Sequence, residues 1–266
     1  MINLNDEKKA TKDVNEDIWN EETYYAWVKR FGEPHDAVQK IMKNPAKLLS
    51  VLYPKFGNVE NKKIMNLMGS NGSKAVALAL MGAKVTVADF SEGNKRYAME
   101  LAKEANVNIE YILSDVLKIS EKQLSENYDI VFAEMGILHY FIDLKPFMEI
   151  VNTLLGNHGL FIIRDFHPVS TKLITSRGTT SKIRKHKVTG DYFDTSIEEK
   201  EVSYTKYLND EEPKKVLHRY WNIGEIVTAI SNAGLVVKSL DEEPNLSSEV
   251  FDKGIPKTFT LVAEKL

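Results

Sequence analysis

Small and acidic residues in the stretch from Lys62 to Ser91 have the spacing of a nucleotide-binding unit. An apolar run ends at Met68 and is followed by the turn Gly69-Ser70-Asn71-Gly72. A second apolar run ends at Asp89. A helix that begins after such a turn directs unpaired N–H groups toward a ligand, and an acid about 20 residues past the glycines can accept two hydrogen bonds from a ribose diol. The alternative is an ordinary βαβ turn that binds nothing.

The two glycines of this turn have different expected tasks. Gly72 lacks a Cβ and is expected to let the backbone approach a ligand closely. Gly69 is expected to adopt a turn conformation that is closed to most residues. The helix that follows begins near Ser73 and ends at Gly82.

Other residues that could bind a ligand or take part in a reaction follow further predicted strands. Continuous apolar runs predict strands over 64–68, 84–88, 108–113, 128–134 and 160–164, separated by helices over 91–105 and 144–155. Strands of this kind are typical of a parallel sheet covered on both faces. Ligands bind such sheets at the carboxyl ends of the strands. Four residues would therefore share a crevice with the glycine turn: Asp115, Glu134, Asp165 and His167.

Two segments lie outside this alternating pattern. Amphipathic helices are predicted over 18–31, 34–42 and 45–53, and aromatic residues at such helical spacing are more often core residues than ligand contacts. Residues 166–220 form an insertion with a β-like run over 202–208. A segment of this length without a helix–strand pair is usually functional or disordered. Capping boxes are predicted at Ser120, before a short helix, and at Asn222, after the insertion. The chain closes with strands near 235–240 and 257–264.

Composition excludes several classes of function. The chain has 266 residues, a net charge of −3 and no cysteine. This charge gives no electrostatic reason to expect a nucleic acid or a membrane as partner. Disulfides, thiolate metal sites and cysteine nucleophiles are excluded, and the histidines show no metal-ligand spacing. The polar start and the lack of an apolar run of about 18 residues predict a cytoplasmic protein.

The stretch around the glycine turn resembles motif I and the following acidic motif of class I S-adenosylmethionine-dependent methyltransferases of the small-molecule subgroup. The ending VTVADFS and the spacing from Asn66 to Asp89 agree with that pattern. Asn66 stands where the family has an acid, and Met68 and Ser70 stand at two glycine positions. Gly72 falls on a family glycine. The resemblance extends over residues 58–266, apart from the insertion.

The resemblance implies the fold and the domain plan. It implies a Rossmann-like α/β doubly wound sheet of seven strands, with the last strand antiparallel beside the fifth. Residues 1–57 would form an N-terminal helical cap over the cofactor and substrate mouth, which makes Tyr24, Tyr25 and Trp27 substrate-side candidates. Residues 58–266 would form the cofactor-binding domain. The insertion at about 166–220 would form an acceptor pocket or a lid.

The resemblance also implies how the crevice is divided. The turn containing Gly69, Ser70 and Gly72 would face the methionine end of S-adenosylmethionine, and Asp89 the ribose. The adenine would lie between Phe90, Asp115 and Val116. Glu134 is a third candidate for proton transfer, and the alternative is that its main-chain carbonyl holds the cofactor's amino group. Asp115 before a short helix has the alternative role of a simple cap.

The acceptor side is less defined by the sequence. His139 matches a histidine common in the subgroup, and His167 follows the fifth strand on the same rim. If the acceptor must lose a proton, a histidine with a pKa near 6.5 can accept it. The interpretation is methyl transfer to a small-molecule acceptor at O, N or C. The alternatives are an NAD(P)-dependent oxidoreductase and a cofactor-binding protein without catalysis.

Overall fold

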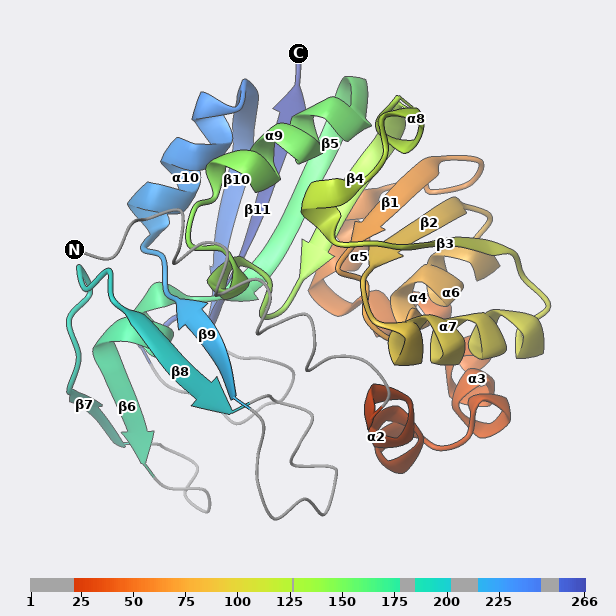
Figure 1. Cartoon of the computed structure of the whole chain (residues 1–266), viewed down its shortest axis with the longest axis horizontal. Helices are drawn as coiled ribbons and strands as arrows, with labels where there is room; N and C mark the ends of the chain where they lie inside the picture. Colours follow the sequence, from red (N-terminus) through yellow and green to blue (C-terminus); the bar gives the residue numbers. More distant parts are fainter. Residues whose placement is uncertain (1–21, 126, 178–184, 202–214, 245–253) are drawn as a thin grey trace.

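A computed structural model of the chain describes residues 22–125, 127–177, 185–201, 215–244 and 254–266. A seven-stranded sheet crosses the molecule in the order β10-β11-β5-β4-β1-β2-β3 (Figure 1). Its strands are β1 (Lys63–Leu67), β2 (Lys84–Asp89), β3 (Ile109–Leu113), β4 (Tyr128–Glu134), β5 (Leu155–Phe166), β10 (Leu235–Glu243) and β11 (Thr258–Lys265). This is the predicted Rossmann-like α/β arrangement.

The closing strands also have the predicted direction. Strands β1 to β5 pair in parallel. Strand β11 lies antiparallel between β5 and β10. A dinucleotide-binding sheet would continue with a parallel strand at this position, so the closing pair disfavours the oxidoreductase alternative.

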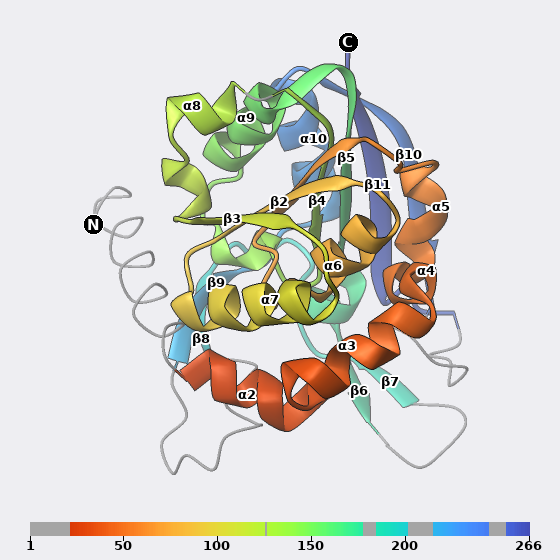
Figure 2. The same cartoon turned by 90° about the vertical axis from the view of Figure 1, so that its right-hand side faces the viewer.

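Two sets of helices cover the two faces of the sheet. One face packs on α2 (Glu22–Phe31), α3 (Pro34–Lys43), α4 (Pro45–Leu49), α5 (Tyr53–Phe56), α6 (Ser73–Leu80) and α7 (Glu92–Glu104). The other packs on α8 (Glu121–Leu124), α9 (Lys145–Leu154) and α10 (Ile223–Asn232). Figure 2 shows α2 and α3 lying along α7. Because both faces are covered, the central strands need apolar residues at consecutive positions, as their sequences show.

Local signals place the helix ends where the sequence predicts them. Ser91 accepts a hydrogen bond from the Asn94 N–H at the start of α7. The capping boxes at Ser120 and Asn222 are both present. The predicted helix over 45–53 is instead divided into α4, the 3-10 turn η1 (Ser50–Leu52) and α5, with Ser50 at a φ of +49°.

The insertion contains two hairpins. A π-helical turn, η4 (Val169–Leu173), leads to β6 (Ile174–Arg177), which pairs with β7 (Lys185–Val188). Strand β8 (Ile197–Glu201) pairs with β9 (Lys215–Arg219). The two hairpins lie below the sheet in Figure 1. The Lys172 Nζ joins them by donating to the main-chain oxygens of Asp194 and Tyr220.

Residues 1–21 and the predicted β-like run over 202–208 lie outside the described residues. The helices α2 to α4 share one apolar core with the sheet, since Trp27, Val38 and Leu49 pack in the same cluster as Ile64. The domain boundary at residue 57 stays a prediction.

Candidate functional site

The glycine turn keeps left-handed backbone conformations although two family glycines are replaced. The φ angles are +49° at Met68, +51° at Ser70 and +70° at Gly72. For the two residues with a side chain this conformation costs about 1–2 kcal/mol each. Surrounding bonds hold it: the Ser70 N–H donates to Asp89 at 3.0 Å, and the Tyr111 hydroxyl donates to the Ser70 main-chain oxygen at 3.0 Å. The turn is therefore built without the full glycine set.

Protein atoms crowd both glycines of the turn. A Cβ on Gly72 would lie 2.4 Å from the Ala98 Cβ, so this glycine lets α6 pack closely on α7 and supplies a positive φ. Gly69 has no left-handed conformation. A Cβ there would lie 2.6 Å from the Asn66 Oδ1 and 2.7 Å from the Val87 Cγ1. The left-handed conformation expected of Gly69 is thus absent, and a close approach of Gly72 to a ligand stays a prediction.

Asp89 is buried at the end of β2 and is held by several donors. Its carboxylate accepts from the main-chain N–H groups of Ser70 and Ser91, both at 3.0 Å, and from the Asn94 Nδ2 at 3.1 Å. Burial raises the pKa of Asp89, and these hydrogen bonds oppose that shift. The main-chain N–H of Phe90 also lowers this pKa, so four donors of the protein face the carboxylate. A carboxylate has about four lone-pair sites, so a ribose hydroxyl would compete with these donors.

The N-terminal helix α2 is connected to this carboxylate. The Trp27 Nε1 donates to the Asn94 Oδ1 at 2.7 Å, and Asn94 donates to Asp89. Trp27 and Tyr24 are buried against α7, whereas Tyr25 is 65% exposed. Of the three aromatic candidates, two are core residues, which is the more frequent role of aromatic residues at helical spacing.

The remaining cofactor-side residues lie at the same edge of the sheet. Asp115 caps the 3-10 turn η2 (Val116–Lys118) by accepting from the Leu117 N–H at 2.9 Å. Val116 is buried and Phe90 is half-buried beyond the end of β2. The cap that sequence reasoning left as an alternative for Asp115 is present, and contact with an adenine stays a prediction.

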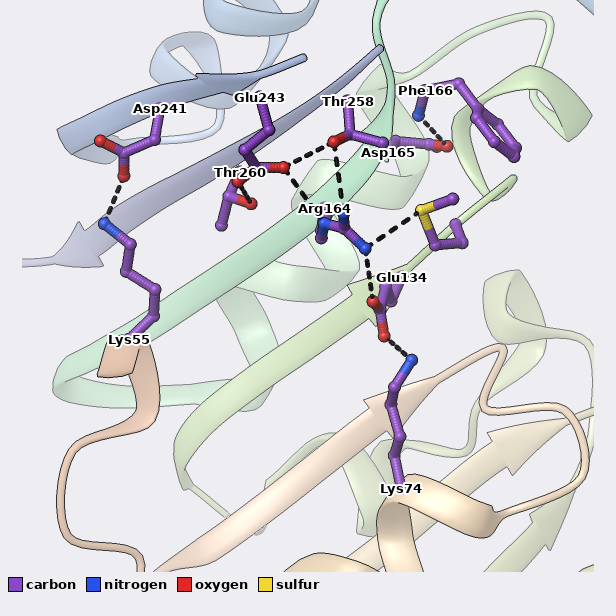
Figure 3. A network of polar contacts seen from close by, with 11 residues as sticks. Lys55, Lys74, Glu134, Arg164, Asp165, Phe166, Asp241, Glu243, Thr258 and Thr260 are labelled. Carbon is purple, nitrogen blue, oxygen red and sulfur yellow. Dashed lines mark hydrogen bonds and ion pairs between the residues drawn. The ribbon is translucent and has the colours of Figure 1, made fainter. Parts of the chain in front are cut away.

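Glu134 belongs to a buried chain of alternating charges, drawn in Figure 3. Its carboxylate pairs with Lys74 on one oxygen and with the Arg164 Nη1 at 3.3 Å on the other. The Arg164 Nε lies 3.3 Å from Glu243, and its Nη2 donates to Thr258 at 3.3 Å. Burial, followed by the charge of Arg164, lowers the pKa of Lys74 to about 8.

Two histidines meet at the rim on the other side of the sheet. His139 lies on η3 (Leu138–Tyr140) after β4, and His218 lies on β9 of the insertion. Their ring centroids are 3.9 Å apart, and Tyr140 and Tyr220 pack around them. Burial lowers the pKa of His139 to about 4. Burial, His139 and Lys200 lower the pKa of His218 to about 3.

Asp165 organises the loop that carries His139. Its buried carboxylate accepts from the main-chain N–H groups of Gly136, Ile137 and Leu138 at 2.6, 3.0 and 3.0 Å. The Trp221 Nε1 donates to the main-chain oxygens of Leu138 and Phe141, both at 3.0 Å, from the end of the insertion. A small cavity lies here, lined by Leu138, His139, Asp165, Phe166, Thr171, Tyr220, Trp221 and Ile226.

His167 has a different environment from His139. Its Nδ1 accepts from the Val169 N–H at 3.1 Å, so its Nε2 carries the proton and donates to Glu242 at 2.6 Å. Both ring nitrogens are therefore used within the protein. Within the described ranges, no group of three or more ligand side chains could hold a metal ion, and no helix is long and apolar enough to cross a membrane.

Comparison with known proteins decides the family. A family profile described as "Methyltransferase domain" matches residues 58–217, which is more than half of the chain. The chain belongs to this methyltransferase family. A search of curated proteins found no match.

Solved structures of methyltransferases share the fold. A Mesorhizobium loti S-adenosylmethionine dependent methyltransferase is 18% identical with a TM-score of 0.60, covering 84% of this chain and 99% of that one. A Clostridium acetobutylicum S-adenosylmethionine-dependent methyltransferase is 13% identical with a TM-score of 0.55, covering 91% of each chain. Magnesium protoporphyrin IX methyltransferase from Synechocystis is 13% identical with a TM-score of 0.59, covering 96% and 100%. The predicted class I fold is thereby confirmed.

Several residues of this methyltransferase site were missed by sequence reasoning. Lys74, Arg164, Glu243 and His218 each contact a predicted site residue or its partner. A signal existed for Arg164, because a charged residue near the end of an apolar strand needs a partner. It stands opposite Glu134 in the β4–β5 register. No local signal exists for His218.

Proposed function

We propose that this methyltransferase transfers a methyl group from S-adenosylmethionine to a small-molecule acceptor. The supporting observation is that β9 of the insertion brings His218 against His139, beside the ends of β4 and β5. Two segments far apart in the sequence thus form one rim with a small polar and aromatic cavity. Small-molecule sites commonly have this composition.

The residues on the other side of the crevice fit the cofactor. The Asn66 Oδ1 is a buried acceptor beside the glycine turn, and it has no hydrogen-bond partner among the described residues. In this proposal Asp89 binds the ribose, and Phe90, Asp115 and Val116 contact the adenine. Gly69, Ser70, Gly72 and Glu134 surround the methionine end. When bound, the cofactor supplies an activated methyl group on a sulfonium. The protein's task is then mainly alignment.

The two rim histidines are suited to orientation. At neutral pH both rings are uncharged, since burial holds each pKa far below 7. A base with so low a pKa accepts a proton poorly at pH 7, whereas its N–H and ring nitrogen can still donate and accept hydrogen bonds. The two histidines are therefore better suited to hold the methyl acceptor by hydrogen bonds than to remove a proton from it. His167, with both nitrogens engaged, is the weaker candidate.

Methyl transfer is tested by product formation. The purified protein is incubated with S-adenosylmethionine and fractions of a cell extract, and S-adenosylhomocysteine is quantified. Formation is expected with the low-molecular-mass fraction, and at least tenfold less with His218→Ala. His158→Gln is the matched control, because the His158 side chain is 76% exposed. Product with only the protein or nucleic-acid fraction would contradict the small-molecule assignment, and binding without any product would support a non-catalytic protein.

The histidine pair is also expected to make stability depend on pH. The pKa of His139 is about 4 in the folded chain and about 6.5 unfolded, so between these values the unfolded state binds more protons. Stability should therefore be lost as the pH falls from 6.5 toward 4, by up to roughly 3 kcal/mol for His139. Urea unfolding at several pH values measures the effect. His139→Gln should make the free energy of unfolding depend less on pH, and His158→Gln should leave this dependence unchanged. The same pH dependence in His139→Gln as in the unmodified protein would contradict the role given to His139.

A further inference from the structure

An ion pair spans the crevice at the point where the strand order reverses. Lys74 is the second residue of α6, directly after the glycine turn, and Glu134 is the last residue of β4. Strand β1 lies between β2 and β4. Open α/β sheets bind ligands beyond the carboxyl ends of the strands at such a reversal. Figure 3 shows the Lys74 side chain reaching from α6 to Glu134.

The two partners differ in how firmly they are held. The Glu134 side chain is 6% exposed, and Arg164 contacts its second oxygen. Arg164 is fixed in turn by Glu243 and Thr258. The Lys74 side chain is 30% exposed and has a long flexible stem. Glu134 therefore keeps a counter-ion if Lys74 turns away, and Lys74 is the partner that can move.

A neutral acceptor lies on the same face of the sheet. Asn66 stands opposite Phe132 in the β1–β4 register, and Glu134 is two residues beyond Phe132. Side chains two residues apart on a strand share a face, so Asn66 and Glu134 are directed to the same side. The Asn66 Oδ1 is buried, and no group in the part of the chain that the structure describes forms a hydrogen bond with it. A cationic N–H donor between Asn66 and Glu134 could donate hydrogen bonds to the Asn66 Oδ1 and to the Glu134 carboxylate.

We propose that Lys74 and Glu134 exchange their mutual ion pair for the amino-acid end of the cofactor. Lys74 binds the carboxylate, and Glu134 together with the Asn66 Oδ1 binds the ammonium group. The inference rests on the proposed function, because it takes S-adenosylmethionine as the cofactor. A zwitterion supplies one charge of each sign, so no buried charge is left without a partner. The partial positive charge at the start of α6 also favours a carboxylate beside Lys74.

This arrangement selects among adenine-containing ligands. A ligand with adenine and ribose but no amino-acid end gives the pair nothing to exchange with, so Lys74 stays on Glu134. Asn66 is neutral where the family has an acid, and in this proposal Glu134 supplies the negative charge that faces the ammonium group. The pair would therefore distinguish S-adenosylhomocysteine from methylthioadenosine, which ends in a methylthio group.

Titration calorimetry with these two ligands tests the subsite. Lys74→Gln is expected to weaken S-adenosylhomocysteine binding about ten- to a hundredfold, the effect of losing a hydrogen bond to a charged group. It should change methylthioadenosine binding by less than about threefold. Lys84→Gln is the matched control, because Lys84 is exposed at the start of β2. Glu134→Gln should show the same ligand selectivity, with thermal unfolding confirming that each variant is folded.

The outcomes separate the subsite from the cofactor assignment. If Lys74→Gln weakens both ligands equally, Lys74 acts through the fold of the turn and the subsite is wrong. If it weakens neither, Lys74 does not contact the ligand and the subsite is also wrong. If the unmodified protein binds neither ligand, the cofactor assignment falls and the subsite falls with it. Selective loss of S-adenosylhomocysteine supports both.

Discussion

Replacing Arg164 with methionine is expected to lower the free energy of unfolding by about 3–5 kcal/mol. Arg164 is 4% exposed and lies between Glu134 and Glu243. Methionine has a similar volume but leaves both carboxylates without this counter-ion in a buried site. Removing one partner of a buried ion pair is costly because the charge that remains is poorly solvated. Urea unfolding of the two proteins at pH 7.5 measures the difference.

A matched surface pair gives the control for Arg164. Lys55 pairs with Asp241 on the same face of the sheet, and their side chains are 28% and 49% exposed. Exposed pairs contribute about 0–1 kcal/mol, so Lys55→Met should change stability little. Adding Glu134→Gln to Arg164→Met should recover part of the loss, since one uncompensated charge is removed. Similar small losses for Arg164→Met and Lys55→Met would show that the buried network contributes no more than a surface pair.

Replacing Asp89 with asparagine is expected to weaken both S-adenosylhomocysteine and methylthioadenosine about ten- to a hundredfold. Both ligands carry the ribose, so the loss should not depend on the amino-acid end. The amide has one acceptor oxygen where the carboxylate has two, and the donors from Ser70, Ser91 and Asn94 already compete for acceptor sites. Titration calorimetry gives both dissociation constants.

Another acid provides the control for Asp89. Asp129 accepts from the Lys63 N–H at 2.8 Å, at the amino ends of β1 and β4. Asp129→Asn alters a similar backbone contact at the far end of the sheet from the crevice, so ligand affinity should be unchanged. Thermal unfolding without ligand shows whether either variant disturbs the fold. If Asp89→Asn weakens the binding of S-adenosylhomocysteine alone, Asp89 contacts the amino-acid end of the ligand and not the ribose.

The sequence by itself determined the order and type of the main elements. Continuous apolar runs indicate strands covered on both faces, and the pattern over 128–134 is of this kind. Capping boxes at Ser120 and Asn222 join residues three apart, so their partners can be read directly from the chain. The edge on which Asp89 and Asp115 lie follows from parallel strands, whose carboxyl ends meet at one side of the sheet. The antiparallel closing strand was implied by resemblance to the methyltransferases.

Only the tertiary structure decided what each residue contacts. Gly72 is needed because Ala98 of α7 occupies the space of its Cβ, and Gly69 because Asn66 and Val87 crowd it. No spacing within the turn carries that information. The turn alone also could not show that Met68 and Ser70 keep left-handed conformations, because bonds from other strands hold them.

The same reason separates the histidines. His139 and His167 read alike in sequence, each following the end of a strand. In the fold, His139 meets His218 from the insertion, while Val169 and Glu242 hold His167 at both nitrogens. Burial then lowers the pKa of His139, a shift that depends on surrounding atoms from distant segments. Local patterns encode elements because they arise from neighbours along the chain. Site chemistry depends on neighbours in space, which the chain supplies only when it is folded.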